Sequence, residues 1–91
     1  MSRADKHATH VKATAAAMED VESSVLARIG YDSSLRILQV EFRSGRVYQY
    51  FDVPSDVHEA LRSAESIGGY FNREIRDKYR TAEVGPAMNS E

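Results

Sequence analysis

The feature that most constrains the fold is an alternation of apolar and polar residues on either side of a glycine at position 45. Leu38, Val40 and Phe42 alternate with polar residues, as in a strand with one buried face. After the glycine, residues 47–53 form a second run rich in β-branched and aromatic side chains. Glycine adopts positive φ without steric cost, as a tight turn requires. This stretch therefore predicts a β-hairpin.

Two turns are compatible with the hairpin, and they place its two tyrosines on opposite faces of the sheet. With a three-residue loop over residues 43–45 and a bulge, Leu38 faces Tyr50, and Tyr48 joins the same apolar face. With a two-residue turn, both phenol rings lie on the other face as an exposed pair. We favour the bulge, because it keeps Gln49 out of the core.

Three strands precede two helices along the chain. Apolar alternation and turn residues predict strands over residues 25–31, 35–42 and 46–53. Apolar residues at helical spacing predict a first helix that starts within residues 52–55 and a second from Ile67 to about Lys78. Short connections favour neighbouring antiparallel strands. We therefore expect an α+β fold, a three-stranded antiparallel meander with two C-terminal helices on one face.

The two ends of the chain lack such patterns. Residues 1–23 are rich in alanine and predict a disordered or partly helical tail with no apolar face to dock. Residues 85–91 show no periodicity and predict a disordered C-terminal tail. We therefore expect a single folded domain over residues 24–84.

The composition excludes several classes of function. The chain has no cysteine, so it has no disulfide framework, thiolate nucleophile or thiolate metal site. His7 and His10 lie one helical turn apart but lack further ligands nearby, and we expect no metal site. No apolar run is long enough to cross a membrane, and the N-terminus lacks the apolar segment of a signal peptide. These features predict a cytoplasmic protein.

Catalysis has no support in the sequence. His58 lies near acidic residues in the first predicted helix, but no nucleophile, base and orienting acid form a recognisable arrangement. The glycine patterns of phosphate loops and dinucleotide sites are also absent. We expect a binding module that is not an enzyme and carries no cofactor.

The central and C-terminal stretches resemble the KTSC domain family. The similarity covers roughly Ser24–Val84, chiefly GYDSSLRILQVEFRSGRVYQYFDVPSDV and SIGGYFNREIRDKY, and Tyr48-Gln49-Tyr50 matches the family's central Y-x-Y signature. The family is named for its occurrence at the C-terminus of some lysyl-tRNA synthetases and also occurs as stand-alone bacterial proteins. The resemblance implies RNA binding and supplies no catalytic residues. After Tyr79 the chain departs from the family's usual proline and aromatic residue, so no final extended segment is expected.

Candidate RNA-binding residues are basic or aromatic. Residues 24–84 contain nine Lys and Arg and nine Asp and Glu, so affinity for phosphates must come from a local patch. Three arginines share one face of the second predicted helix if it persists, two flank the hairpin turn, and exposed rings stack on bases. A solvated basic face is the alternative interpretation of these arginines. The candidate residues are Arg43, Arg46, Tyr48, Tyr50, Arg73, Arg76, Lys78 and Arg80.

Gly68 and Gly69 in the first turn of the second predicted helix need a separate explanation, because glycine disfavours helix interiors. The first explanation is close packing of the helix end on the sheet or on the other helix. The second is an anion site formed by the bare amides of the helix N-terminus. We favour the packing explanation and keep both residues as candidate anion-binding positions.

A rival function is protein interaction through the sheet face that the two helices leave uncovered. The bulged register turns Phe51 away from the helices, and Leu35 and Ile37 are further apolar candidates on that face. An apolar interface responds little to salt, whereas RNA binding weakens steeply as salt rises. RNA and another protein are therefore the two candidate partners.

Overall fold

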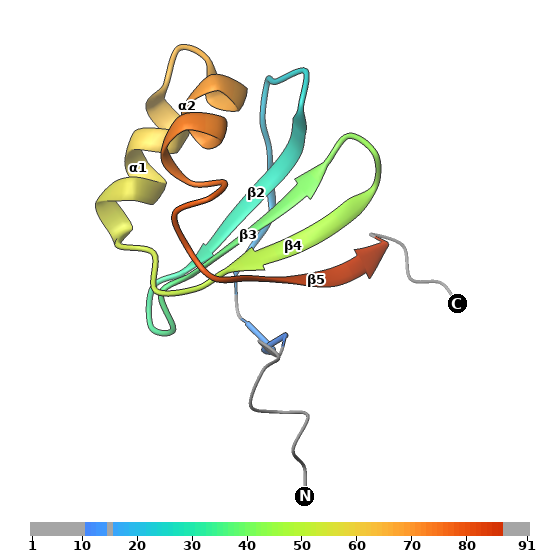
Figure 1. Cartoon of the computed structure of the whole chain (residues 1–91), viewed down its shortest axis with the longest axis vertical. Coiled ribbons are helices and arrows are strands. Elements are labelled where there is room, and N and C mark those ends of the chain that lie inside the picture. Colours follow the sequence, from blue (N-terminus) through green and yellow to red (C-terminus); the bar gives the residue numbers. More distant parts are fainter. Residues whose placement is uncertain (1–10, 15, 87–91) are drawn as a thin grey trace, which may run out of the picture.

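The sheet has five strands, and two helices pack on one of its faces (Figure 1). The computed structural model describes residues 11–14 and 16–86. The elements are β1 (Glu19–Asp20), β2 (Leu26–Asp32), β3 (Ile37–Phe42), β4 (Arg46–Tyr50), α1 (Ser55–Ser63), α2 (Ile67–Glu74) and β5 (Thr81–Pro86). Each strand pairs antiparallel with the next. The α+β class and the meander are confirmed, but the prediction of three strands is wrong.

The hairpin of β3 and β4 has the predicted bulged register. Leu38 lies opposite Tyr50, and Tyr48 follows on the same face. Gly45 has a φ of 98°, and its N–H donates to the carbonyl oxygen of Phe42 at 2.8 Å. Both tyrosines therefore face the helices rather than the other side of the sheet.

The main core lies between this face and the helices. Its ring-rich part is organised around Phe71, which packs edge-to-face on Phe42 and Tyr50 with centroids 5.6 and 5.5 Å apart. Apolar residues that alternate along the strands and repeat at helical spacing supply these side chains, as expected. The buried core consists of Leu26, Ile29, Leu38, Val40, Tyr50, Val53, Leu61, Phe71 and Ile75.

Helix α2 is shorter than predicted, because it ends at Glu74 instead of continuing to about Lys78. Ile75 leaves the helical region with φ −122° and ψ −46°, yet its side chain remains fully buried. The N–H of Arg76 bonds to the carbonyl oxygen of Phe71, which closes a wider turn. The apolar spacing of the sequence therefore continues past the end of the helix itself.

Strand β5 lies where no extended segment was expected. Its sequence has little apolar alternation, but its main chain pairs along the free edge of β4. The Thr81 hydroxyl donates to the carbonyl oxygen of Gln49 at 2.8 Å, which fixes the start of the pairing. Main-chain pairing at a sheet edge leaves no hydrophobic pattern, and this explains why the sequence did not reveal the strand.

The second sheet face is covered, which corrects the prediction of an open face. Residues 11–14 and 16–18, which we call the strap, contain no helix and contact this face before the chain enters β1. The blue trace in Figure 1 marks the strap on the side away from the helices. Ile37 and Phe51 are buried, whereas Leu35 is exposed in the β2–β3 turn. Phe51 is therefore not the exposed ring that the bulged register suggested.

Several predictions concern parts of the chain beyond the described residues. Residues 1–10, which include His7 and His10, and residues 87–91 lie outside them. The boundaries at residues 24 and 84 stay predictions, although β1 precedes the first and β5 runs past the second. Within the described ranges, no helix is long and apolar enough to cross a membrane.

Candidate functional site

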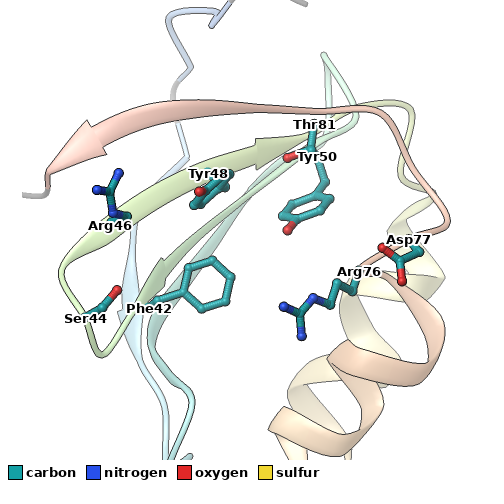
Figure 2. Close-up of a pocket in the computed structure, with 8 residues that line it drawn as sticks. All are labelled: Phe42, Ser44, Arg46, Tyr48, Tyr50, Arg76, Asp77 and Thr81. Atoms are coloured by element: carbon teal, nitrogen blue, oxygen red, sulfur yellow. The ribbon is translucent and has the colours of Figure 1, made fainter.

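A groove of about 380 Å³ opens between the β3–β4 hairpin, β5 and the turn after α2. Figure 2 shows Arg46 at the hairpin end of the groove and Arg76 at the helix end, with three aromatic rings between them. We call it the tyrosine groove. Its lining residues are Phe42, Ser44, Arg46, Tyr48, Tyr50, Arg76, Asp77 and Thr81.

The aromatic wall of the groove is held rigidly by the core. The rings of Phe42 and Tyr48 pack edge-to-face, with centroids 5.5 Å apart at 83°. Tyr50 packs in the same way on Phe71 and is only 4% exposed, whereas Tyr48 is half-buried. Tyr50 is therefore mainly a core residue that touches the groove, and Tyr48 presents the more accessible ring.

The two groove arginines differ in how far their charges are balanced. Arg46 forms an ion pair with Glu83 of β5, whose other carboxylate oxygen lies 3.5 Å from the Tyr48 hydroxyl. Arg76 donates to the neutral side-chain oxygen of Asn72 at 3.0 Å. In the part of the chain that the structure describes, Arg76 has no carboxylate within ion-pair distance. Arg76 is therefore the groove cation more available to an anionic ligand.

The pKa of the Tyr50 phenol depends on its position between the core and the groove. Burial raises its pKa above the ordinary value, while a hydrogen bond to the Thr81 side chain and the positive charge of Arg76 act in the opposite direction. The phenol therefore stays protonated at neutral pH. It serves as a hydrogen-bonding group, and it is not placed to act as a base.

The other predicted nucleic-acid-binding residues lie outside the groove. Arg43 donates through Nε to the carbonyl oxygen of Ser23 at 3.0 Å, and Arg73 lies 3.8 Å from Glu74. Arg80 pairs with Asp52 at 3.0 Å, and its guanidinium lies over the ring of Phe51. Lys78 is exposed in the turn after α2.

The predicted arginine face on the second helix does not form, because α2 ends at Glu74. Arg76 and Arg80 both follow the helix and point to different surroundings, one into the tyrosine groove and the other toward Asp52. The structure thus brings together four of the eight candidates, namely Arg46, Tyr48, Tyr50 and Arg76.

The glycine pair at the start of α2 is explained by close approach. A Cβ on Gly68 would lie 3.2 Å from both Ser23 Oγ and Val25 Cγ2. The N–H of Gly69 already donates to the Ser66 hydroxyl at 3.1 Å, which caps the helix. These contacts favour the packing explanation over an anion site.

Four lining residues of the groove were not singled out from the sequence, namely Phe42, Ser44, Asp77 and Thr81. Phe42 shares the period-2 face of the hairpin with Tyr48, so the chosen register already implied that the two rings meet. Thr81 and Asp77 reach the groove only because the chain turns back after α2 and pairs β5 with β4. No local pattern in the sequence predicts the turn between α2 and β5.

His58, the one histidine of α1, has a structural environment. Its ring stacks on Tyr31 with centroids 4.7 Å apart, and the Tyr31 hydroxyl donates to the carbonyl oxygen of Val53. Burial lowers the pKa of His58, and the charge of Arg62 adds to the effect. The histidine is therefore largely neutral at neutral pH and forms part of the packing between α1 and β2.

Comparisons with known proteins agree on one family. The KTSC domain model matches residues 22–79. An uncharacterised protein of Stutzerimonas stutzeri is 42% identical over 59 residues, which is 65% of this chain and 83% of that protein. A lysine–tRNA ligase of Nostoc punctiforme is 42% identical over 63 residues, 69% of this chain but only 11% of the ligase. The crystal structure of a KTSC domain protein from Yersinia pestis superposes with a TM-score of 0.76 at 37% identity, covering 78% of this chain and all of that one.

Proposed function

The chain belongs to the KTSC domain family, and we propose that it is a non-enzymatic module that binds single-stranded RNA in the tyrosine groove. Tyr48 offers its ring to a base, while Arg76 and Arg46 bind phosphates on either side of it. One observation carries this proposal: Arg76, which has no carboxylate partner among the described residues, and the partly exposed phenol of Tyr48 line the same open groove.

The chemistry of the groove suits a short single strand better than a duplex. Unpaired bases stack on aromatic side chains for about 1–3 kcal/mol each, and a duplex keeps its bases out of reach. Arginine binds phosphate oxygens through two parallel N–H bonds, which adds geometric selectivity. A groove of about 380 Å³ suits only a few nucleotides.

The relatives supply a second line of support. A lysine–tRNA ligase acts on an RNA, and the region similar to this chain makes up 11% of that enzyme. An appended small domain that grips a single-stranded part of an RNA would help such an enzyme to hold its substrate. In a stand-alone chain the same groove would act as a free RNA-binding surface.

The salt dependence of binding should be shallow. Binding of single-stranded nucleic acid weakens with a log–log slope of about −0.7 per neutralised phosphate, so two contacts predict about a sevenfold loss between about 50 and 200 mM salt. A much steeper loss would indicate a broad basic surface. The equal numbers of basic and acidic residues over positions 24–84 argue against such a surface.

The experiment is a titration with a short single-stranded RNA of mixed sequence, followed by amide chemical shifts. Shifts should cluster around Tyr48, Arg46 and the turn at Arg76. Arg76→Gln should weaken binding about tenfold, because a charge-assisted contact is lost. Arg73→Gln is the matched control: it removes an exposed arginine of the same helical region that does not line the groove.

A further pair of variants tests the stacking step. Tyr48→Leu should weaken RNA binding by the stacking free energy of about 1–3 kcal/mol, whereas Tyr48→Phe keeps the ring and should bind like the natural protein. Equal effects of Arg73→Gln and Arg76→Gln, or unchanged binding in Tyr48→Leu, would contradict the proposal.

A further inference from the structure

The second face of the sheet carries one straight row of residues under the strap. Gly30 of β2 lies opposite Gln39 of β3, and Gln39 lies opposite Gln49 of β4. Lys12 contacts the Gln49 end of this row, and Met18 lies at the Gly30 end. The strap therefore runs across three strands along a single line.

Gln49 binds the main chain of the strap. Its Oε1 accepts the N–H of Lys12 at 2.8 Å, and its Nε2 donates to the Lys12 carbonyl oxygen at 2.7 Å. The same Nε2 donates to Oε1 of Gln39 at 2.9 Å. Gln49 is only 1% exposed. A buried amide thus makes with Lys12 the two bonds that a neighbouring strand would make, and the side chain of Lys12 takes no part in them.

The other end of the row requires small residues. A Cβ on Gly30 would lie 2.8 Å from Met18 Sδ, 2.9 Å from the Ala17 carbonyl oxygen and 3.3 Å from Ala16 Cβ. The main chain of the strap therefore approaches β2 more closely than any other residue at position 30 would allow. At this point the strap passes with the Ala17 main chain and Ala16 Cβ against the bare backbone of Gly30, and Met18 Sδ lies beside them.

The strap lies outside the stretch that matches the family model, and few contacts hold it. The KTSC domain match begins at residue 22, after the strap has ended. Val11 is 46% exposed, and Ala13 and Ala17 are exposed too, so these residues bury little apolar area. Segments with few buried apolar contacts open most readily in native proteins. The strap therefore has the properties of a ligand that is tethered to its site.

We propose that the second sheet face is a binding site for an extended, small-residue segment of a partner protein, recognised through its main chain, and that the strap occupies this site in cis. The partner segment replaces the strap at Gln49 and Gly30. A tethered competitor acts at an effective concentration in the millimolar range. The strap therefore sets the affinity or concentration that the partner segment needs in order to bind. The tyrosine groove lies on the opposite side of the sheet, and RNA should not compete with the peptide.

The test uses the full chain with the strap released by Lys12→Pro together with Ala16→Asp. Proline removes the N–H that Gln49 accepts, and the aspartate places a charge at the close contact with Gly30. Both changes lie in the strap and leave the face intact. The probe is a fluorescent peptide with the sequence of residues 11–20, VKATAAAMED.

We expect the peptide to bind the released variant and to bind the natural chain at least about tenfold more weakly, because the tethered strap competes. Adding Gln49→Ala to the released variant should weaken peptide binding at least about tenfold, since a buried main-chain contact is lost. A control peptide with proline in place of the lysine should bind neither protein. RNA affinity should be the same in all variants.

Three results would overturn the proposal. The first is no peptide binding to a folded variant whose strap has left the face. The second is equal binding to the natural chain and the released variant. The third is a strap that stays on the face despite both substitutions. If the released variant does not fold, millimolar unlabelled peptide is added to the natural chain instead, and an unmoved backbone amide signal of the chain's own Lys12 would also overturn the proposal.

Discussion

The two faces of the sheet are buried by different means. On the helix side, apolar side chains from two helices interlock with Leu38, Tyr50 and their neighbours, and Phe71 lies at the centre. On the strap side, a short alanine-rich segment lies across a row of glycine and glutamines, and hydrogen bonds between Gln49 and the main chain of Lys12 hold it there. On the first face, the burial of apolar side chains contributes much stability but recognises no particular segment. On the second face, the contacts contribute little stability but require a main chain in one position. The first face therefore fixes the fold, and the second is suited to exchange.

The largest difference between the faces should be seen in stability. Phe71→Ala removes a fully buried ring from the core and should lower the free energy of unfolding by about 3–5 kcal/mol. Urea unfolding measures the loss. A loss below about 1.5 kcal/mol would show that the helix face can repack around the cavity, and the contrast with the strap face would disappear.

Gln49→Ala tests the strap face in the same way. A buried polar group left without its partner costs about 1–3 kcal/mol, but the strap is free to leave the face and bind water, so we expect a loss near the lower limit. Hydrogen exchange should show that the Lys12 amide has lost its protection while the core amides keep theirs. Gln39→Ala is the control, because it leaves both bonds between Gln49 and Lys12 in place. A loss as large as that of Phe71→Ala would contradict the comparison.

The two faces also differ in what the sequence revealed. The bulged register of the hairpin followed from alternation and from keeping Gln49 out of the core, and it placed Tyr48 and Tyr50 correctly. Alternation alone does not predict where the side chain of Gln49 is placed instead. Gln49 is buried on the opposite face by main-chain partners, and such partners have no signature in hydrophobic periodicity.

The candidate site was predicted only in part for a similar reason. Arg76 was grouped with Arg73 and Arg80 on the assumption of a continuous helix, because apolar residues at every fourth position run on to Tyr79. The helix stops at Glu74 while Ile75 stays buried, so the three guanidinium groups separate. The meeting of Arg76 with Tyr48 and Tyr50 depends on that turn and on β5, both of which form through contacts distant in sequence.

Gly30 and Gly45 allow a finer comparison, because each requires glycine for a different reason. Gly45 has nothing within 4 Å of a built Cβ but has positive φ, so Gly45→Ala should lower stability by about 1 kcal/mol through backbone strain and leave the strap in place. Gly30 lacks positive φ, and Gly30→Ala should act through the strap alone. Its effect on the free energy of unfolding should be under about 1 kcal/mol, because loss of the strap leaves the core intact.

Hydrogen exchange at Lys12 separates the two glycine variants. The amide should exchange fast in Gly30→Ala and remain protected in Gly45→Ala. If both variants kept the protection, the close approach of the strap to β2 would not be what holds it. If both lost it, the strap would depend on the hairpin turn rather than on the row beneath it.

The smallest expected effect uses pH, because among the described residues only the helix side holds a partly buried histidine. Burial lowers the pKa of His58 below its ordinary value of 6.5, so the unfolded chain takes up this proton before the folded chain does. Stability should therefore fall as pH decreases through 6.5, and the contribution levels off once the pH is below the folded pKa. His58→Gln should reduce this decline between about pH 7.5 and pH 5.5, above the range in which carboxylates titrate. Strap protection at Lys12 should not change with pH in this window, and a parallel change would mean that the two faces are coupled through the sheet.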